Sequence, residues 1–272
     1  MITLVSFTDA SHNMLFTLSK DKWLADLAKS GKASLVGYQE AEGRNQRTTL
    51  NEYCTKNDRK LYLPAGTGCG IGWKKGVFGA YGPDDKPFQG MKRVHTNAEA
   101  MGFKTKYLPS MEFVYVGLYH HGAKKSVLRI NVHPISGATR TVLKDNDKEP
   151  GITQWKNWAI QQYWLDVLSF TAKEMSRGVA ANSMKRFWDV IIIGGDYNGD
   201  LHLAADDEWY YPSRMLPALY AKDRIAGGLD HMQHAYGSDV AIDRRWQVPA
   251  NSDHNIHFTT RTFKAVDDTP GK

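Results

Sequence analysis

Short apolar or alternating segments recur along the chain, and polar residues follow most of them directly. Segments of this length with many β-branched residues are typical of β-strands. The predicted strands cover 2–7, 33–39, 61–64, 70–74, 113–119, 127–133, 190–194, 229–236 and 256–263. The segments at 76–92, 136–151 and 199–217 are predicted to be loops, in which Tyr81, Phe88 and the triplet at 209–211 either stack on a substrate or anchor the loop.

Two segments instead place their apolar residues at helical spacing. Ser19 is expected to cap a helix over 20–30 that ends at Gly31, and Thr153 begins a longer helix that runs to 177 and stops at Gly178. Many strands with few long helices predict an α+β fold, a four-layer αββα sandwich in which two packed mixed β-sheets are flanked by helices. We expect one domain over 1–272, with a flexible tail at 265–272.

The segment from Val190 to Asn198 carries the strongest chemical signal. Its apolar part predicts a buried strand, which ends in two glycines followed by Asp196 and Asn198. Alternate residues of an extended chain point the same way, so these two side chains can address one site. A carboxylate beside a neutral amide suits a divalent cation together with a phosphate.

Similar groups of polar residues stand at the ends of other predicted strands. Each group alone has a structural explanation, such as capping a loop. Together they gather more metal-binding and titratable side chains at strand ends than solubility requires, and this favours a phosphate-handling site. The four groups of polar residues are Gln39-Glu40, Asn131-x-His133, Asp230-His231 and Asp253-His254.

In this order, the motifs resemble those of the endonuclease/exonuclease/phosphatase superfamily, to which deoxyribonuclease I belongs. The resemblance runs from the first predicted strand to the last and implies the same αββα architecture, with the site at one edge of the sandwich. One position departs from the pattern, because Thr8 stands where the family usually has a metal- or phosphate-binding Asn. Asp9 or Asn13 can take over that task.

The resemblance also implies roles in the cleavage of a phosphodiester. Glu40 would be the principal ligand of Mg²⁺ or Mn²⁺, with Asp253 contributing. Asp196 and Asn198 would contact the metal, the phosphate or the attacking water. His254 would act as the general base, although Asp196 also remains a candidate for that proton.

Further roles follow from the same comparison. Asp230 would orient His254, while His133 would face the other side of the phosphate with Glu112 as its candidate partner. Thr8, Arg44 and Arg47 are candidate phosphate-binding residues. Glu42 occupies the position at which deoxyribonuclease I has a DNA-holding Arg, and this weakens the analogy with that enzyme's grip on DNA.

The charge of the chain favours a polyanionic partner. The formal net charge is +6 and the pI is near 9.1, with basic pairs such as Lys74-Lys75, Lys92-Arg93 and Arg244-Arg245. The predicted activity is a metal-dependent nuclease, an endonuclease that cleaves DNA rather than RNA. The alternatives are a phosphatase or phospholipase C-like hydrolase of phosphoinositides, sphingolipids or small phosphorylated substrates, and an inactive nucleic-acid-binding module.

The remaining features predict a cytoplasmic, monomeric protein with no obligatory membrane partner. No segment has the pattern of a signal peptide or of a transmembrane helix. Cys54 and Cys69 lack metal-binding spacing and are expected to be reduced thiols.

Overall fold

The structure, a computed structural model, describes residues 4–15, 18–94, 111–134, 150–177, 187–198, 230–236 and 240–264, with the backbone alone at 150–161, 230–236 and 264. Two sheets make up its centre. Sheet A has the strand order β11-β12-β1-β2-β4-β3, and sheet B has the order β10-β9-β8-β7-β5, with β6 also paired to β7. The strands of sheet A are β1 (Leu4–Asn13), β2 (Leu35–Gln39), β3 (Arg59–Tyr62), β4 (Gly70–Lys74), β11 (Val240–Val248) and β12 (Ile256–Lys264). Those of sheet B are β5 (Phe78–Ala80), β6 (Gln89–Val94), β7 (Met111–His120), β8 (Lys125–Val132), β9 (Val190–Asp196) and β10 (Asp230–Tyr236).

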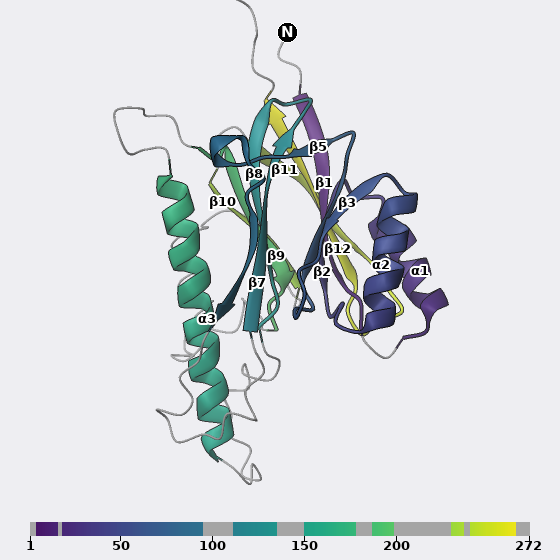
Figure 1. Cartoon of the computed structure of the whole chain (residues 1–272), viewed down its shortest axis with the longest axis vertical. Helices are drawn as coiled ribbons and strands as arrows, with labels where there is room; N and C mark the ends of the chain where they lie inside the picture. The colour runs from purple at the N-terminus through teal and green to yellow at the C-terminus, as the bar shows by residue number, and fades with distance from the viewer. Residues whose placement is uncertain are drawn as a thin grey trace, which may run out of the picture.

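Helices cover the outer face of each sheet. Helices α1 (Lys20–Ser30) and α2 (Arg44–Lys56) lie together against sheet A, and the long α3 (Pro150–Ser176) runs along sheet B (Figure 1). A 3₁₀ turn (Pro83–Asp85) lies between β5 and β6. The resulting order of helix, sheet, sheet and helix confirms the predicted αββα sandwich.

Three apolar cores separate the four layers. One lies between α3 and sheet B and contains Trp164 and Ile193, and another lies between α1, α2 and sheet A and contains Leu27 and Tyr38. The third lies between the two sheets and contains Phe7 of β1. Burial of this apolar surface supplies the main favourable term in folding.

The space between the sheets changes from apolar to polar along the strands. On β1, Phe7, Asp9, Ser11 and Asn13 alternate with residues that face the helices, so all four share the inner face. Phe7 belongs to the apolar core between the sheets, whereas Asp9 pairs at 3.2 Å with Arg129 of β8, both fully buried. The polar end of this space is where the candidate site lies.

Several elements differ from those predicted. Strand β1 continues to Asn13 although polar residues begin at Thr8, because its inner face is buried against polar side chains of sheet B. The predicted loop at 76–92 is wrong in part, since it contains β5 and most of β6, whose glycines and charges lie in short strands beside β7. Helix α2 and strand β11 were not predicted from the sequence.

Aromatic residues of the 76–92 segment anchor it to the domain. Tyr81 stacks on Phe187 with ring centroids 5.3 Å apart, and Phe88 lies 5.0 Å from Tyr115. These contacts therefore support the predicted anchoring role of Tyr81 and Phe88 rather than stacking on a substrate. The triplet at 209–211, the predicted loop at 199–217 and the tail at 265–272 lie outside the described residues, as does most of the predicted loop at 136–151.

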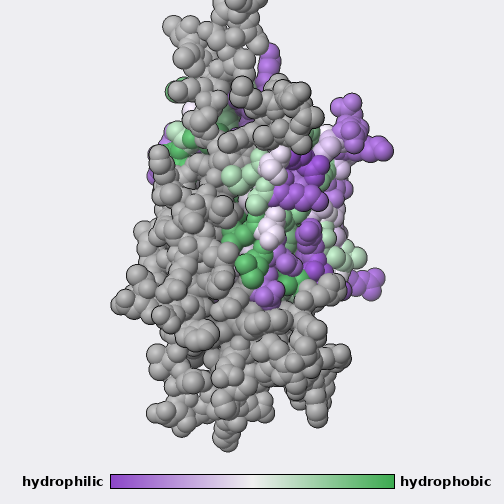
Figure 2. All heavy atoms as spheres, turned by 90° about the vertical axis from the view of Figure 1, so that its left-hand side faces the viewer, coloured by the Kyte–Doolittle hydropathy of each residue, from purple (hydrophilic) through white to green (hydrophobic). Residues whose placement is uncertain are grey.

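The described surface mixes polar and apolar residues. Figure 2, which views the molecule from the side of α3, shows hydrophobic described residues beside strongly hydrophilic ones. Cys54 and Cys69 are both free and buried. Among the described helices, none combines the length and the apolar character that crossing a membrane would require.

Candidate active site

Three titratable side chains from both sheets converge at the polar end of the sandwich. One ligand atom from each of Glu40, His133 and Asp196 lies within 4.8 Å of the other two. Glu40 directly follows β2 of sheet A, His133 directly follows β8 of sheet B, and Asp196 ends β9 next to it. The carboxyl ends of these strands therefore deliver the three groups to one place.

The local backbone shows why these strands end as they do. Gly195 has φ +144°, and a Cβ at this position would lie 2.0 Å from the carbonyl oxygen of Val132, so only glycine permits the close pairing of β9 with β8. Glu40 and Asn198 have φ values of 56° and 50°, in the left-handed region that non-glycine residues rarely adopt. Such conformations cost free energy and concentrate at functional sites.

Asn13 holds the two carboxylates together. Its Nδ2 donates to Glu40 Oε1 at 3.0 Å and to Asp196 Oδ2 at 3.2 Å, while its Oδ1 accepts a bond from the Leu15 N–H. Asn13, one of the two substitutes expected for Thr8, is thus a first-strand residue that reaches this cluster. The signal was present in the period-two alternation of Asp9, Ser11 and Asn13, but the predicted strand ended before it.

Two histidines lie near the same carboxylate oxygen, Oδ2 of Asp196. His133 Nε2 lies 3.8 Å from both Glu40 Oε1 and Asp196 Oδ2, and His254 Nε2 lies 3.6 Å from Asp196 Oδ2. His254 Nε2 is also 3.7 Å from Asp253, whose side chain is 65% exposed. Asp253 is not part of the group formed by Glu40, His133 and Asp196.

Asn198 supports the Asp196 position, and the register of β10 places Asp230 opposite Asp196. The Asn198 N–H donates to Asp196 Oδ1 at 2.8 Å, and Asn198 Nδ2 donates to the Pro134 carbonyl at 2.7 Å, so this residue also holds the segment after His133. Strand β10 places Asp230 directly opposite Asp196 in the antiparallel register. The backbone of Asp230 therefore lies next to that of Asp196.

A fully buried amide pair ties the two sheets together just behind the site. Gln39 Nε2 donates to Asn131 Oδ1 at 2.6 Å, and Asn131 Nδ2 donates to the carbonyls of Tyr38 and Gly70 at 2.7 and 3.0 Å. A Cβ at Gly37 would lie 2.4 Å from Asn131 Oδ1, so a glycine is needed beside this tie. Because Gln39 precedes Glu40 and Asn131 lies two residues before His133, the tie sets the spacing between those two groups.

The structure does not bring all candidate residues to this cluster. Thr8 lies in the middle of β1, five residues before Asn13 and on the opposite face, with its hydroxyl 3.5 Å from that of Thr260. The Arg47 guanidinium donates to the carbonyls of Leu63, Pro64 and Thr67, and so braces the turn before β4. Arg44 is exposed in the first turn of α2.

Glu112 has a partner other than His133. Its carboxylate accepts a bond from Arg93 Nε at 3.1 Å. A link to His133 runs through Tyr163, whose hydroxyl accepts the His133 N–H at 3.1 Å and donates to the Glu112 carbonyl at 3.3 Å. Burial raises the pKa of Tyr163, so the hydroxyl stays protonated in this bridge.

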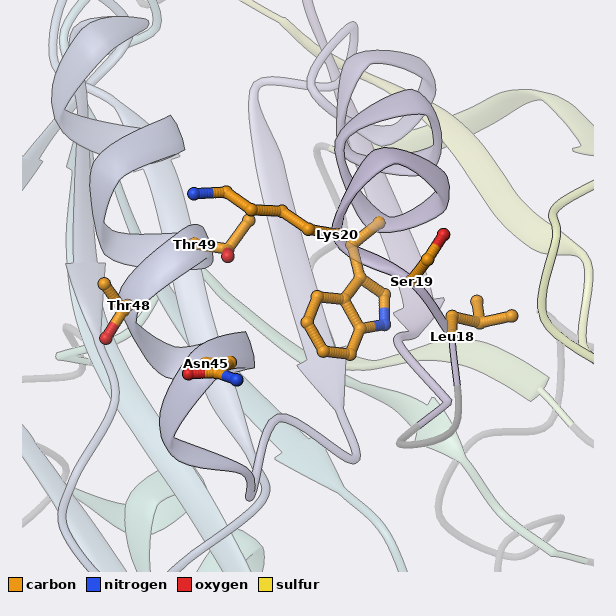
Figure 3. A pocket seen from close by; sticks show the side chains of 7 residues that line it. Leu18, Ser19, Lys20, Asn45, Thr48 and Thr49 are labelled. Atoms are coloured by element: carbon orange, nitrogen blue, oxygen red, sulfur yellow. The ribbon is translucent and has the colours of Figure 1, made fainter.

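A cavity of about 340 Å³ lies apart from this cluster, in the helical layer outside sheet A. Figure 3 shows it between the N-terminal turns of α1 and α2. It is lined by Leu18, Ser19, Lys20, Trp23, Asn45, Thr48 and Thr49. None of the clustered carboxylates or histidines lines it, so the chemistry does not centre there.

No protein-family model matches this chain, and no curated protein matches it either. Solved structures do match over nearly the whole chain. An endonuclease/exonuclease/phosphatase family protein from Bacteroides thetaiotaomicron superposes with a TM-score of 0.62 at 12% identity, covering 96% of this chain and 99% of the other. The human Nocturnin catalytic domain gives a TM-score of 0.56 at 11% identity, covering 97% and 98% of the two chains.

A third match is ANGEL2, described as a 2',3'-cyclic phosphatase, in complex with adenosine-2',3'-vanadate. Its TM-score is 0.60 at 10% identity, and the match covers 97% of this chain and 99% of that one. The sheet order, the layers and these superpositions agree with one another. The chain therefore has the fold of the endonuclease/exonuclease/phosphatase superfamily.

Proposed function

We propose that this protein is a divalent-metal-dependent phosphodiester hydrolase, a nuclease whose first expected substrate is DNA. The observation that supports this most directly is the convergence of Glu40, Asn13, Asp196 and two histidines at one end of the sandwich. Hydrolysis of a phosphodiester requires charge neutralisation at the phosphate, proton transfer and a positioned nucleophile. This cluster holds groups suited to each task.

The donor set fits a hard divalent cation. Glu40 and Asp196 direct carboxylate oxygens at one amide group of Asn13, and like charges this close repel unless a cation or a donor lies between them. Oxygen ligands are those that Mg²⁺ and Mn²⁺ prefer. Glu40 and Asp196 would hold the ion, with His133 at the margin, and the bound ion would neutralise charge on the phosphate and position it.

The histidines would divide the proton transfers. His254 lies beside Asp196 on the side of Asp253, where it would accept the proton of the attacking water. His133 lies between Glu40 and Asp196, where it would donate a hydrogen bond to the phosphate or to the leaving oxygen. Asp196 Oδ2 lies within 3.8 Å of Nε2 of both rings, so it would orient them.

Nucleic acid is the substrate class that the charge supports. The formal net charge of +6 favours a polyanion. Among proteins of the same fold, zebrafish (D. rerio) TDP2 has been solved with a single-strand DNA product, at a TM-score of 0.55 and 12% identity. ANGEL2 is described as a cyclic phosphatase, so a terminal or cyclic phosphate is the second substrate to test.

The test is nicking of supercoiled plasmid DNA by purified protein with Mg²⁺ or Mn²⁺, compared with EDTA. We expect nicking with the metal and none with the chelator. A His254→Ala variant, purified in parallel, controls for a contaminating nuclease and should lose turnover while keeping its thermal stability. Activity that persists in EDTA would refute metal dependence. Absence of nicking, with phosphate release from a 2',3'-cyclic nucleotide, would replace DNA by that substrate.

A further inference from the structure

A row of charged residues crosses sheet B at the level of the candidate site. Arg93 of β6 is the registered partner of Glu112 on β7, and Val132, just before His133, pairs with Gly195, just before Asp196. Between β7 and β8, the Tyr163 hydroxyl joins the backbones of Glu112 and His133. Residues in such a row point to one face, so Arg93 lies on the site's side of the sheet.

The guanidinium of Arg93 is fixed and still accessible. Its Nε donates to Glu112 at 3.1 Å; the Arg93 side chain is 44% exposed, whereas that of Glu112 is only 8% exposed. This bond uses one of five N–H donors, and within the described part of the chain the two amino groups have no other acceptor. A guanidinium held in this way is suited to a bidentate contact with phosphate.

A turn braced by hydrogen bonds faces Arg93. Gly66 lies opposite, where an added Cβ would meet Arg93 Nη2 at 3.6 Å. The three bonds from Arg47 to the carbonyls of residues 63, 64 and 67 hold this turn in place. Arg47, a candidate phosphate-binding residue from the sequence, thus shapes the turn that faces Arg93.

We propose that Arg93 binds a second phosphate group of the substrate, one that is not cleaved. Neighbouring strands lie about 4.8 Å apart, so Arg93 is roughly 10 Å from His133 across β7. Because its Nε is held on Glu112 of β7, the strand between β6 and β8, Arg93 is placed to hold another phosphate of the same strand rather than the one under attack. The inference rests on the proposed function. It favours an oligonucleotide as the substrate over a compound with a single phosphate.

The test measures binding of a fluorescent single-stranded DNA 12-mer in EDTA, where no cleavage occurs. Arg93→Ala should weaken binding about tenfold, the usual size of one charged hydrogen-bonding contact. It should also lower the slope of log K against log salt by about 0.7, the value for one phosphate on a single strand. Lys92→Ala is the matched control, because Lys92 points the other way, 5.3 Å from the Phe170 ring on α3.

Loss of Arg93 would leave the buried Glu112 carboxylate without its partner, so a second variant is needed. The double variant Arg93→Gln/Glu112→Gln removes both charges and should show the same loss of slope with a melting temperature near that of the parent. A slope equal to the parent's in a folded variant would overturn the proposal. So would an equal effect of Lys92→Ala. Neither readout depends on turnover, so failure of the plasmid assay would overturn the proposed function separately.

Discussion

At the scale of single residues, Asn13 is the side chain on which the candidate site depends most. It is almost fully buried, and one amide group contacts both carboxylates. The sequence supplied Glu40, His133, Asp196 and His254 through strand-end motifs, and the structure brings these four together. Asn13 remained one of two alternatives, because a polar residue after an apolar segment is usually the beginning of a loop.

Replacement of Asn13 by Ala should lower kcat of the metal-supported reaction at least tenfold. The two carboxylates would lose their shared donor, a loss typical of about 1.5–3 kcal/mol for a hydrogen bond to a charged group. Thr8→Ala is the matched control on the same strand, and we expect it to leave kcat within twofold. Steady-state kinetics on an oligonucleotide would measure both. A strong effect of Thr8→Ala alone would show that Thr8, and not Asn13, is the first-strand residue on which activity depends.

His120 should make the fold sensitive to acid. Burial among Phe7, Phe78 and Phe263 lowers the pKa of His120 to about 4. The unfolded chain, with a pKa near 6.5, binds the proton more readily, so the stabilisation is present above about pH 6.5 and is lost as the pH falls toward 4.

The expected loss for His120 between pH 7 and pH 5 is about 2 kcal/mol of unfolding free energy. Urea titrations at both pH values would measure it, and His120→Phe should reduce the difference by that amount. His12, whose pKa burial also lowers to about 4, would still contribute in the variant. An identical pH dependence in parent and variant would contradict the assignment to His120.

At the scale of elements, the sequence predicted apolar strands better than polar ones. Helix α1 has the predicted bounds, and β9 extends its prediction by two residues into the site. Helix α2 escaped prediction because its buried face includes Gln46 and Thr49 beside Leu50 and Cys54, which gives no clear apolar stripe. Strand β11 escaped because it is an edge strand, whose charged and partly exposed residues break the alternation.

The amide tie between β8 and β2 should control the geometry of the site. In an Asn131→Asp variant, the carboxylate cannot donate to the Tyr38 and Gly70 carbonyls, and a charge would be buried. We expect a loss of about 3 kcal/mol in stability and a lower kcat at unchanged KM. Chemical denaturation and kinetics would test this.

Asn57→Asp is the control for that substitution, because Asn57 makes an exposed bond to the Tyr53 carbonyl at the end of α2. Its stability should change by less than about 1 kcal/mol. If both variants were equally stable and active, the tie would have no role in setting the distance between Glu40 and His133.

At the scale of the whole molecule, the four-layer sandwich followed from the count and spacing of strands, whereas its exact strand order did not. Which β-strands pair depends on contacts between distant segments, such as β1 with β12 and β8 with β9. The same limit on prediction from the sequence applies to the site. Motifs showed which residues matter, but only pairing could show that Arg47 braces a turn and that Glu112 pairs with Arg93.

Binding of a divalent cation should stabilise the fold as a whole. A ligand at one hundred times its Kd adds about 2.7 kcal/mol to the free energy of unfolding, a rise in Tm on the order of 5 °C. Mn²⁺ should therefore raise the Tm of the parent and EDTA should reverse the rise. Glu40→Gln should abolish it, whereas Glu52→Gln, at an exposed residue paired with Lys20, should not. An equal rise in all three proteins would place the metal elsewhere.

The polar inner face of β1 has a consequence for how the chain finds its fold. A slip of β1 by one residue would turn Asp9, Ser11 and Asn13 toward the helices and place Ala10 and Met14 between the sheets. The slip would leave Arg129 without the carboxylate of Asp9. It would also remove the Asn13 amide that joins Glu40 to Asp196. Correct strand register and a complete site are therefore a single outcome of folding, and selection for activity also selects against misregistered chains.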